Sequence, residues 1–129
     1  MTPAWVRAVF LVSGLYDGVL GLAFLGWGPE LFEAFGVPPP NHFGYVHFPA
    51  LLLLVFGWMF LRIAGDPVRH RGLMPYGMAL KSAYSGVVFF HLLTGGIPAI
   101  WVPFAWADLV FLILFVLAWR MTAERRPPA

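Results

Sequence analysis

Four long apolar runs, separated by short breaks rich in glycine and proline, limit what this chain can fold into. The runs cover residues 4–27, 45–64, 73–93 and 100–121. Each is close to the ~20 residues that an α-helix needs to cross the ~30 Å hydrocarbon core of a bilayer. Because lipid satisfies no open backbone group, and the runs lack the alternation of barrel strands, we expect helices. The sequence therefore predicts an all-α membrane protein with four transmembrane helices in an up-down bundle.

The composition supports this class and narrows the chemistry. Of 129 residues, 60% are hydrophobic and 11% are charged, whereas a soluble domain carries about 25% charged residues. The length suits a single transmembrane domain, 1–129. There is no cysteine, which excludes disulfides, thiolate metal sites and redox chemistry by cysteine pairs. A redox role would need a bound cofactor, and the sequence identifies none.

The first run resembles a signal peptide because Arg7 precedes an apolar stretch. It is too long for a signal peptide, carries Asp17 at its middle, and lacks a small-x-small cleavage site before polar sequence. We therefore expect a helix that is retained in the membrane.

The arginines predict the orientation. All fall before the first run, between the second and third, or after the fourth: Arg7, Arg62, Arg69, Arg71, Arg120, Arg125 and Arg126. The opposite links carry Glu30 and Glu33 or no charge at all. By the positive-inside rule, both termini and the middle link face the cytoplasm of a multi-pass protein in the cell's inner (plasma) membrane. Orientation and contact with lipid headgroups account for the basic residues, so we expect no nucleic-acid partner.

The link between the first two helices, "PELFEAFGVPPPNHFGYVHFP", is the largest segment outside the membrane. Leu31, Phe32 and Phe35 share one side of a short helical pattern, and a run of three prolines follows. We expect a short helix in the interface and then an extended segment. This link is either a plain lid on the outer end of the bundle or a gate over a pocket.

Three ionisable residues from three different helices fall at one depth. A helix rises about 1.5 Å per residue, and the arginines mark the cytoplasmic interface. The depths are ~15 Å for Asp17 measured from Arg7, ~15 Å for Lys81 measured from Arg71, and ~18 Å for Asp108 measured from Arg120. An unpaired charge at this depth costs at least about 2.5–3.5 kcal/mol, so the three should face inward and pair. Whether Lys81 pairs with Asp17 or with Asp108 stays open.

The helical spacing extends this intramembrane polar cluster to Tyr84 and Ser85, which lie on the same stripe as Lys81. With one lysine and two aspartates, the count of charges is odd. One carboxyl is then neutral, or a bound cation balances it. The cluster either holds the helices together or titrates and binds something as part of the function.

Two histidines form an outer-half polar pair. His47 lies ~22 Å from Arg62 along its helix, and His91 lies ~30 Å from Arg71. The offset of ~8 Å argues against a haem held between them. His42 and His47 raise the alternative of a shallow metal site with His91, but interfacial hydrogen bonding is the simpler interpretation, and we assign no metal ligand.

No catalytic residue is assigned, because phosphate loops, H-E-x-x-H and G-x-S-x-G patterns are all missing from the sequence. The glycines of the first run are interpreted as packing notches. Gly14 and Gly18 form a small-xxx-small pair, which serves either packing within one bundle or dimerisation.

The order "GLYDGVLGLAFL", "FPALLLLVFGWMFL", a basic loop, "ALKSAYSGVVFF" and "WADLVFLILF" resembles small bacterial four-helix membrane proteins of the DoxX-like kind. The resemblance covers nearly the whole chain, and Asp17, Lys81 and Asp108 are its shared marks. Some DoxX-like proteins are described as membrane subunits of quinone-linked oxidoreductases. The resemblance thus implies an accessory or quinone-binding role, and no catalytic residue is carried over.

Two main hypotheses follow. The first is a non-enzymatic membrane protein, an accessory subunit or a binder of an amphipathic small molecule such as a lipid or quinone. The second is a proton-coupled or ion-conducting transporter in which the cluster titrates and which, with so few helices, needs a homodimer or a larger membrane complex. A lesser alternative is a haem- or quinone-linked redox subunit.

Overall fold

The computed structural model describes residues 2–123, and these residues form only helices and the links between them. The helices are α1 (Ala4–Ala34), α2 (Gly44–Gly65), α3 (Met74–Thr94) and α4 (Trp101–Ala123), with a short 3₁₀ turn at Arg71–Leu73. Three of them, α1, α2 and α4, are long and apolar enough to cross a membrane. The predicted ranges 45–64, 73–93 and 100–121 lie close to the bounds of α2, α3 and α4.

The first helix differs from the prediction at its end. It was expected to stop at residue 27, but α1 continues to Ala34 across a kink at Trp27, whose φ of −132° and ψ of 29° are not helical. Pro29 explains the break, because its ring clashes with the carbonyl four residues earlier and it has no N–H to donate. The short helix expected in the outer link therefore follows the first helix directly at an angle.

Two of the helices are followed by a glycine with a positive φ angle. Gly36 has a φ of 65° beyond α1, and there the N–H of Val37 donates to the carbonyl of Phe32 at 2.9 Å. Gly96 has a φ of 92° after α3, and its N–H donates to the carbonyl of His91 at 2.6 Å. Both turns satisfy carbonyls that the helix leaves open, at a backbone conformation that glycine adopts without strain.

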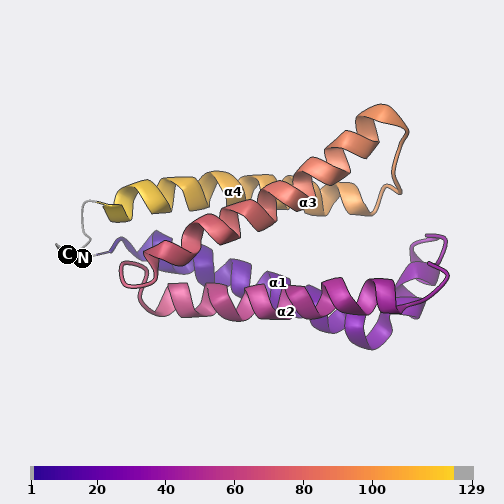
Figure 1. Cartoon of the computed structure of the whole chain (residues 1–129), viewed down its shortest axis with the longest axis horizontal. Coiled ribbons are helices and arrows are strands. Elements are labelled where there is room, and N and C mark those ends of the chain that lie inside the picture. The colour runs from indigo at the N-terminus through magenta and orange to yellow at the C-terminus, as the bar shows by residue number, and fades with distance from the viewer. Residues whose placement is uncertain (1, 124–129) are drawn as a thin grey trace.

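The helices form two pairs. α1 packs mainly along α2, and α3 packs mainly along α4. Figure 1 shows the pairs close together where α1 begins, α4 ends and α2 leads into α3, and diverging toward the opposite end. We refer to these two ends of the molecule as the closed end and the open end.

Glycines bring α1 and α2 into backbone contact. A Cβ atom on Gly14 would lie 2.9 Å from the carbonyl oxygen of Gly57, and one on Gly21 would lie 2.6 Å from that of Ala50. A Cβ on Gly18 would meet nothing within 4 Å. The expected glycine notch therefore works inside the chain, between α1 and α2, with Gly14 and Gly21 at the tightest points.

The closed end holds the apolar core. Its buried residues come from all four helices: Val6, Phe10, Phe60, Ile63, Met74, Phe115 and Ala118. The rings of Phe10 and Phe115 stack with their centroids 4.5 Å apart. This packing joins the two helix pairs at the closed end.

Arginines tie the helix ends together beside this core. Arg7 donates to the carbonyl of Gly65 at 2.8 Å, which joins the start of α1 to the end of α2. Arg71 donates from Nε to the backbone carbonyl of Trp119 at 3.0 Å. Its Cζ atom also lies 4.2 Å from the centre of the Trp119 ring. Arg125 and Arg126, which the orientation argument also used, lie outside the described residues.

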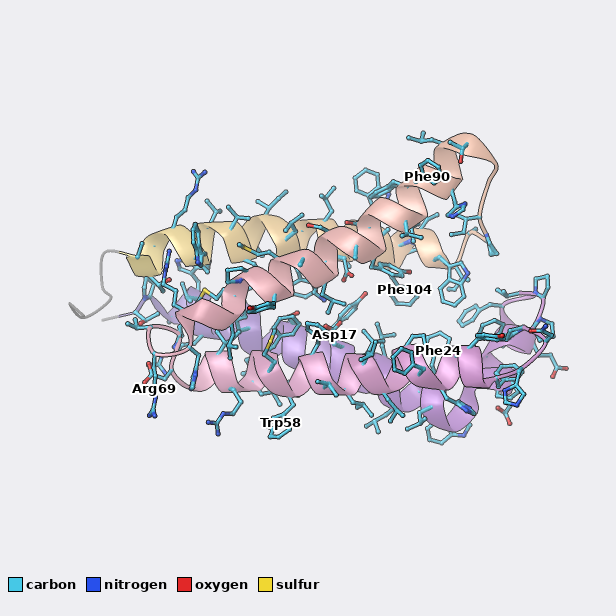
Figure 2. The ribbon with its side chains drawn as sticks, in the orientation of Figure 1. Asp17, Phe24, Trp58, Arg69, Phe90 and Phe104 are labelled. Atoms are coloured by element: carbon cyan, nitrogen blue, oxygen red, sulfur yellow. The ribbon has the colours of Figure 1, made fainter. Side chains whose placement is uncertain are left out.

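The outer surface of the helices is apolar. Large side chains remain exposed along every helix, among them Val19, Trp58, Val87 and Val110. Trp58, 69% exposed, points away from the other helices in Figure 2. An apolar outer surface of this extent is what a lipid environment requires, and it supports a membrane protein.

Candidate functional site

Three charged side chains meet between the helix pairs. The Nζ atom of Lys81 lies 3.0 and 3.1 Å from the two carboxylate oxygens of Asp17, and 3.2 Å from Oδ1 of Asp108. All three residues are buried. The structure thus brings together the residues that the depth argument placed at one level. The question of which acid pairs with Lys81 is thereby answered, because Lys81 donates hydrogen bonds to both Asp17 and Asp108.

The local sequence explains why Lys81 faces inward. The buried residues of α3 follow helical spacing along one stripe: Met74, Gly77, Lys81, Ser85 and Val88. At Gly77 a Cβ atom would lie 2.5 Å from the ring of Phe60, so the missing side chain lets α2 come close to α3. The stripe therefore turns Lys81 toward the interior, one turn above the close contact.

Asp17 and Asp108 are placed by their own helices in the same way. Asp17 is buried on α1 between Gly14 and Gly21, the two points where α2 approaches most closely. Asp108 is buried on α4, one turn after the small residue Ala105. Both carboxylates can thus reach the lysine from opposite helix pairs.

Aromatic rings surround the lysine. Its Nζ atom lies 5.0 Å from the ring centre of Phe111, 5.4 Å from that of Tyr16 and 5.5 Å from that of Phe60. Within about 6 Å, the negative face of an aromatic ring attracts a cation. Two carboxylates and three rings therefore surround the ammonium group.

Tyr84 and Ser85 belong to the same region but do not bond to the charged groups. The Ser85 hydroxyl donates to the backbone carbonyl of Lys81 at 2.7 Å, and the Tyr84 hydroxyl donates to that of Trp101 at 3.0 Å. Tyr84 thereby ties α3 to the start of α4. Among the described residues, the charged part of the site consists of Asp17, Lys81 and Asp108 alone.

Asp17, Lys81 and Asp108 form a charged triad, and a cavity of about 360 Å³ opens next to it, toward the open end. Its lining is almost entirely apolar and comes from all four helices, including Leu20, Phe24, Leu53, Leu80, Trp101 and Phe104. Asp17, Asp108, Tyr16 and Tyr84 also line it. In Figure 2, Asp17 and Phe104 project into the space between the two helix pairs. The cavity thus has aromatic and aliphatic walls, and Asp17 and Asp108 of the charged triad form its polar end.

Two polar atoms beside the cavity lack hydrogen-bond partners. The Tyr16 hydroxyl is buried without a partner. Asp108 uses Oδ1 for Lys81, and its Oδ2 accepts no hydrogen bond from any described residue. The Tyr16 hydroxyl is buried, and a buried polar atom without a partner is costly. A group that pairs with this hydroxyl and with Asp108, which lines the cavity, would be stabilised there.

The outer link covers the cavity. Phe32, beyond the kink in α1, lies against Phe43 with ring centres 5.6 Å apart and against Trp101 at 5.9 Å. Phe24, before the kink, lies 5.8 Å from Trp101. Phe32 also lines the cavity. The link thus forms part of the cavity wall, which agrees with both the lid and the gate.

The histidines are not part of this site. His91 is exposed at the end of α3, and His47 is partly buried beside Phe43 on α2. His42 accepts a hydrogen bond at Nδ1 from the backbone N–H of Gly44 at 2.9 Å. Among residues 2–123, no three histidine or acidic side chains gather to hold a metal ion.

Sequence reasoning missed Tyr16 and the cavity. Tyr16 directly precedes Asp17 in the chain, so it could have been noted as a polar atom at the same depth. Trp101, which the sequence analysis did not assign to a site, also lines the cavity. The cavity itself arises from the divergence of the helix pairs, for which the sequence carries no local signal.

Comparison with known protein families, with curated proteins and with solved structures finds no match for this chain. The function must therefore be argued from the site alone.

Proposed function

We propose that this protein is a non-enzymatic membrane protein that binds an amphipathic small molecule in the cavity between its helix pairs. One observation carries the proposal: an apolar cavity of about 360 Å³ ends on a buried carboxylate that is only partly neutralised. Ligand pockets of roughly 300–1,000 Å³ with apolar walls and a few polar groups are typical of small-molecule sites. The charged triad then organises the bundle and also supplies the polar end of the site.

The proposal includes a membrane setting in which all four helices cross the bilayer as an up-down bundle. α3 has 21 residues, enough to span with its single lysine because two acids already pair with that lysine. Arg7 and Arg71 contact neighbouring helix ends at the closed end. By the positive-inside rule, this end and both termini face the cytoplasm of the inner membrane.

A bound ligand would lie with its polar group toward Asp108 and Tyr16 and its apolar body among the rings near the open end. Leu52 and Tyr45 of the lining are exposed on the outer surface of α2, so the cavity reaches the surface where lipid would lie. Lipids and quinones both have this amphipathic form. A role as an accessory subunit, which the DoxX-like resemblance implies, is compatible with such a site.

Native mass spectrometry of the protein purified in mild detergent, with an absorption spectrum of the same sample, tests this proposal. We expect a stoichiometric extra mass on the wild type. Its loss is expected in Leu20→Trp, which fills the cavity, but not in the matched change Leu15→Trp on the exposed side of α1. A ligand retained equally by both variants would contradict the cavity as the site. A Soret band would instead favour the haem alternative.

A second candidate function is proton transfer, and the shared lysine favours it specifically. Asp17 and Asp108 share one ammonium group, so one of them can hold a proton in place of a second cation. Proteoliposomes that contain a pH-sensitive dye test this directly. Proton flux that disappears in Asp108→Asn but persists in Glu33→Gln would favour the relay, and flux no greater than in empty liposomes would exclude it.

A further inference from the structure

We infer that the ligand of this cavity is a lipophilic monocation, an ammonium group carried on an apolar or aromatic body. The inference rests on the proposed binding function and specifies its chemistry. Asp108 would be the main contact for the cation, and the aromatic walls would hold the body of the molecule.

The balance of charges is the first argument. The triad holds two carboxylates and one ammonium group, so with all three ionised it carries a net charge of −1 in an apolar interior. Lys81 donates to both oxygens of Asp17 but to one oxygen of Asp108. A buried carboxylate is stable only when it is paired or protonated, so the triad can accept one further positive charge, which a ligand with an ammonium group would supply.

The position of the unpaired oxygen is the second argument. Asp108 is 7% exposed and lines the cavity, and its Oδ2 has no hydrogen-bond partner among the described residues. An ionised carboxylate only accepts hydrogen bonds. A ligand must therefore bring a donor to this atom, and a charged donor forms the stronger bond.

The walls of the cavity provide the third argument. Tyr16, Phe104 and Trp101 line it together with few polar atoms. Rings of this kind attract a cation at their faces. The protein already shows this chemistry a few ångströms away, where Tyr16, Phe60 and Phe111 surround the ammonium group of Lys81. The Tyr16 hydroxyl, which has no partner, offers a second acceptor to an ammonium donor.

The same features disfavour other ligands. An anion would face a net negative triad whose lysine is fully engaged. An oxidised quinone offers only acceptors, so it would leave Oδ2 of Asp108 without a donor. A cation is the class that uses both Asp108 and the rings.

The test compares two probes that differ mainly in charge: 4-phenylbutylammonium and its neutral analogue 4-phenylbutan-1-ol. Binding is measured by equilibrium dialysis against the protein in nanodiscs of zwitterionic lipid, with empty nanodiscs subtracted. We expect the ammonium probe to bind more tightly. In Asp108→Asn its affinity should fall roughly tenfold or more, while the affinity of the alcohol should change little. Glu33→Gln, which removes an exposed carboxylate in the outer link, should leave both unchanged.

Two further variants keep the inference open to refutation if Asp108→Asn folds poorly. Tyr16→Phe keeps the ring and removes the hydroxyl, so it should weaken the ammonium probe more than the alcohol, because a charged donor forms the stronger hydrogen bond. Leu20→Trp should weaken both probes, which locates them in the cavity. Equal affinity of the two probes for the wild type would overturn the cation class and leave the binding function intact. Failure of the wild type to bind either probe would overturn both.

Discussion

The closed end and the open end of this molecule are built from similar residues and used in opposite ways. At the closed end, Phe10, Phe60 and Phe115 fill the space between the helix pairs, with no exposed surface. At the open end, Phe24, Trp101 and Phe104 line a cavity. The comparison shows that aromatic content does not decide whether a region is packed or hollow. The separation of the backbones decides it.

The charged triad lies between these two regions and serves both. Toward the closed end, Lys81 contacts the ring of Phe60, which belongs to the core. Toward the open end, Asp108 and Asp17 line the cavity. A fixed core on one side and a paired triad in the middle allow the other side to remain open without loss of the fold.

The largest loss of stability is expected from Lys81→Met, which removes the cation that pairs with both Asp17 and Asp108 between the two regions. Removal of one partner from a buried ion pair costs about 3–5 kcal/mol because the other charge stays buried and unpaired. Unfolding in mixed detergent micelles would measure this loss. The double variant Asp17→Asn/Lys81→Met should be more stable than the single one, since it removes an unpaired charge. A single variant as stable as the wild type would show that the triad is not structural.

A smaller effect is expected from Phe10→Ala, which tests the packed side directly. Phe10 has no exposed surface and stacks on Phe115, so its truncation leaves a void that costs about 3 kcal/mol. Phe104 is half-buried and lines a cavity that already exists, so the matched change Phe104→Ala should cost less than Phe10→Ala. The same unfolding measurement compares them. Equal losses would mean that the open end is packed as tightly as the closed end.

Gly21→Ala should come next, because it separates α1 from α2 on the cavity side. Its Cβ atom would lie 2.6 Å from the carbonyl oxygen of Ala50, and overpacking of this kind costs about 1–3 kcal/mol. Gly18→Ala is the control, as its Cβ meets nothing within 4 Å. Thermal unfolding in detergent should show a lower midpoint for Gly21→Ala only. A lower midpoint for Gly18→Ala as well would place a further partner on that face.

The smallest effect is expected from Arg71→Lys at the rim of the closed end. The substitution removes the stacking of the guanidinium group on Trp119 and its Nε hydrogen bond, worth about 0.5–1 kcal/mol at a partly exposed site. Arg62→Lys, at an exposed position on α2, should be neutral. If both variants unfold alike, the Arg71 contact contributes nothing to the closed end.

The features that the sequence predicted are those that depend on distance along a helix. The end of α3 followed from the breaker Gly95, and the shared level of Asp17, Lys81 and Asp108 followed from the rise per residue. Pro29 predicted the end of the first helix, but it produces a kink, and the helix continues to Ala34. These quantities need no knowledge of the neighbouring helices.

The features that it could not predict depend on how the helices face and cross one another. Tyr84 falls on the polar stripe, yet its hydroxyl bonds to the carbonyl of Trp101 because α4 begins beside it. The sequence leaves open which acid Lys81 contacts, and the structure shows that it contacts both Asp17 and Asp108. The cavity depends on the angle between two helix pairs, which arises from ridge-and-groove packing over whole helices rather than from any one residue.

The sequence separations within the triad also bear on how the protein is made. Lys81 lies 64 residues after Asp17 but 27 residues before Asp108. When Lys81 leaves the ribosome, Asp17 has therefore already left it, and Asp108 has not. In the proposed four-span topology, α1 must be in the membrane before α3 can enter with its charge paired. The helices would then insert in order. The α1–α2 hairpin would be in the membrane first and Asp17 would pair with Lys81 as α3 inserts. Asp108 would join the triad last, when α4 packs against α3.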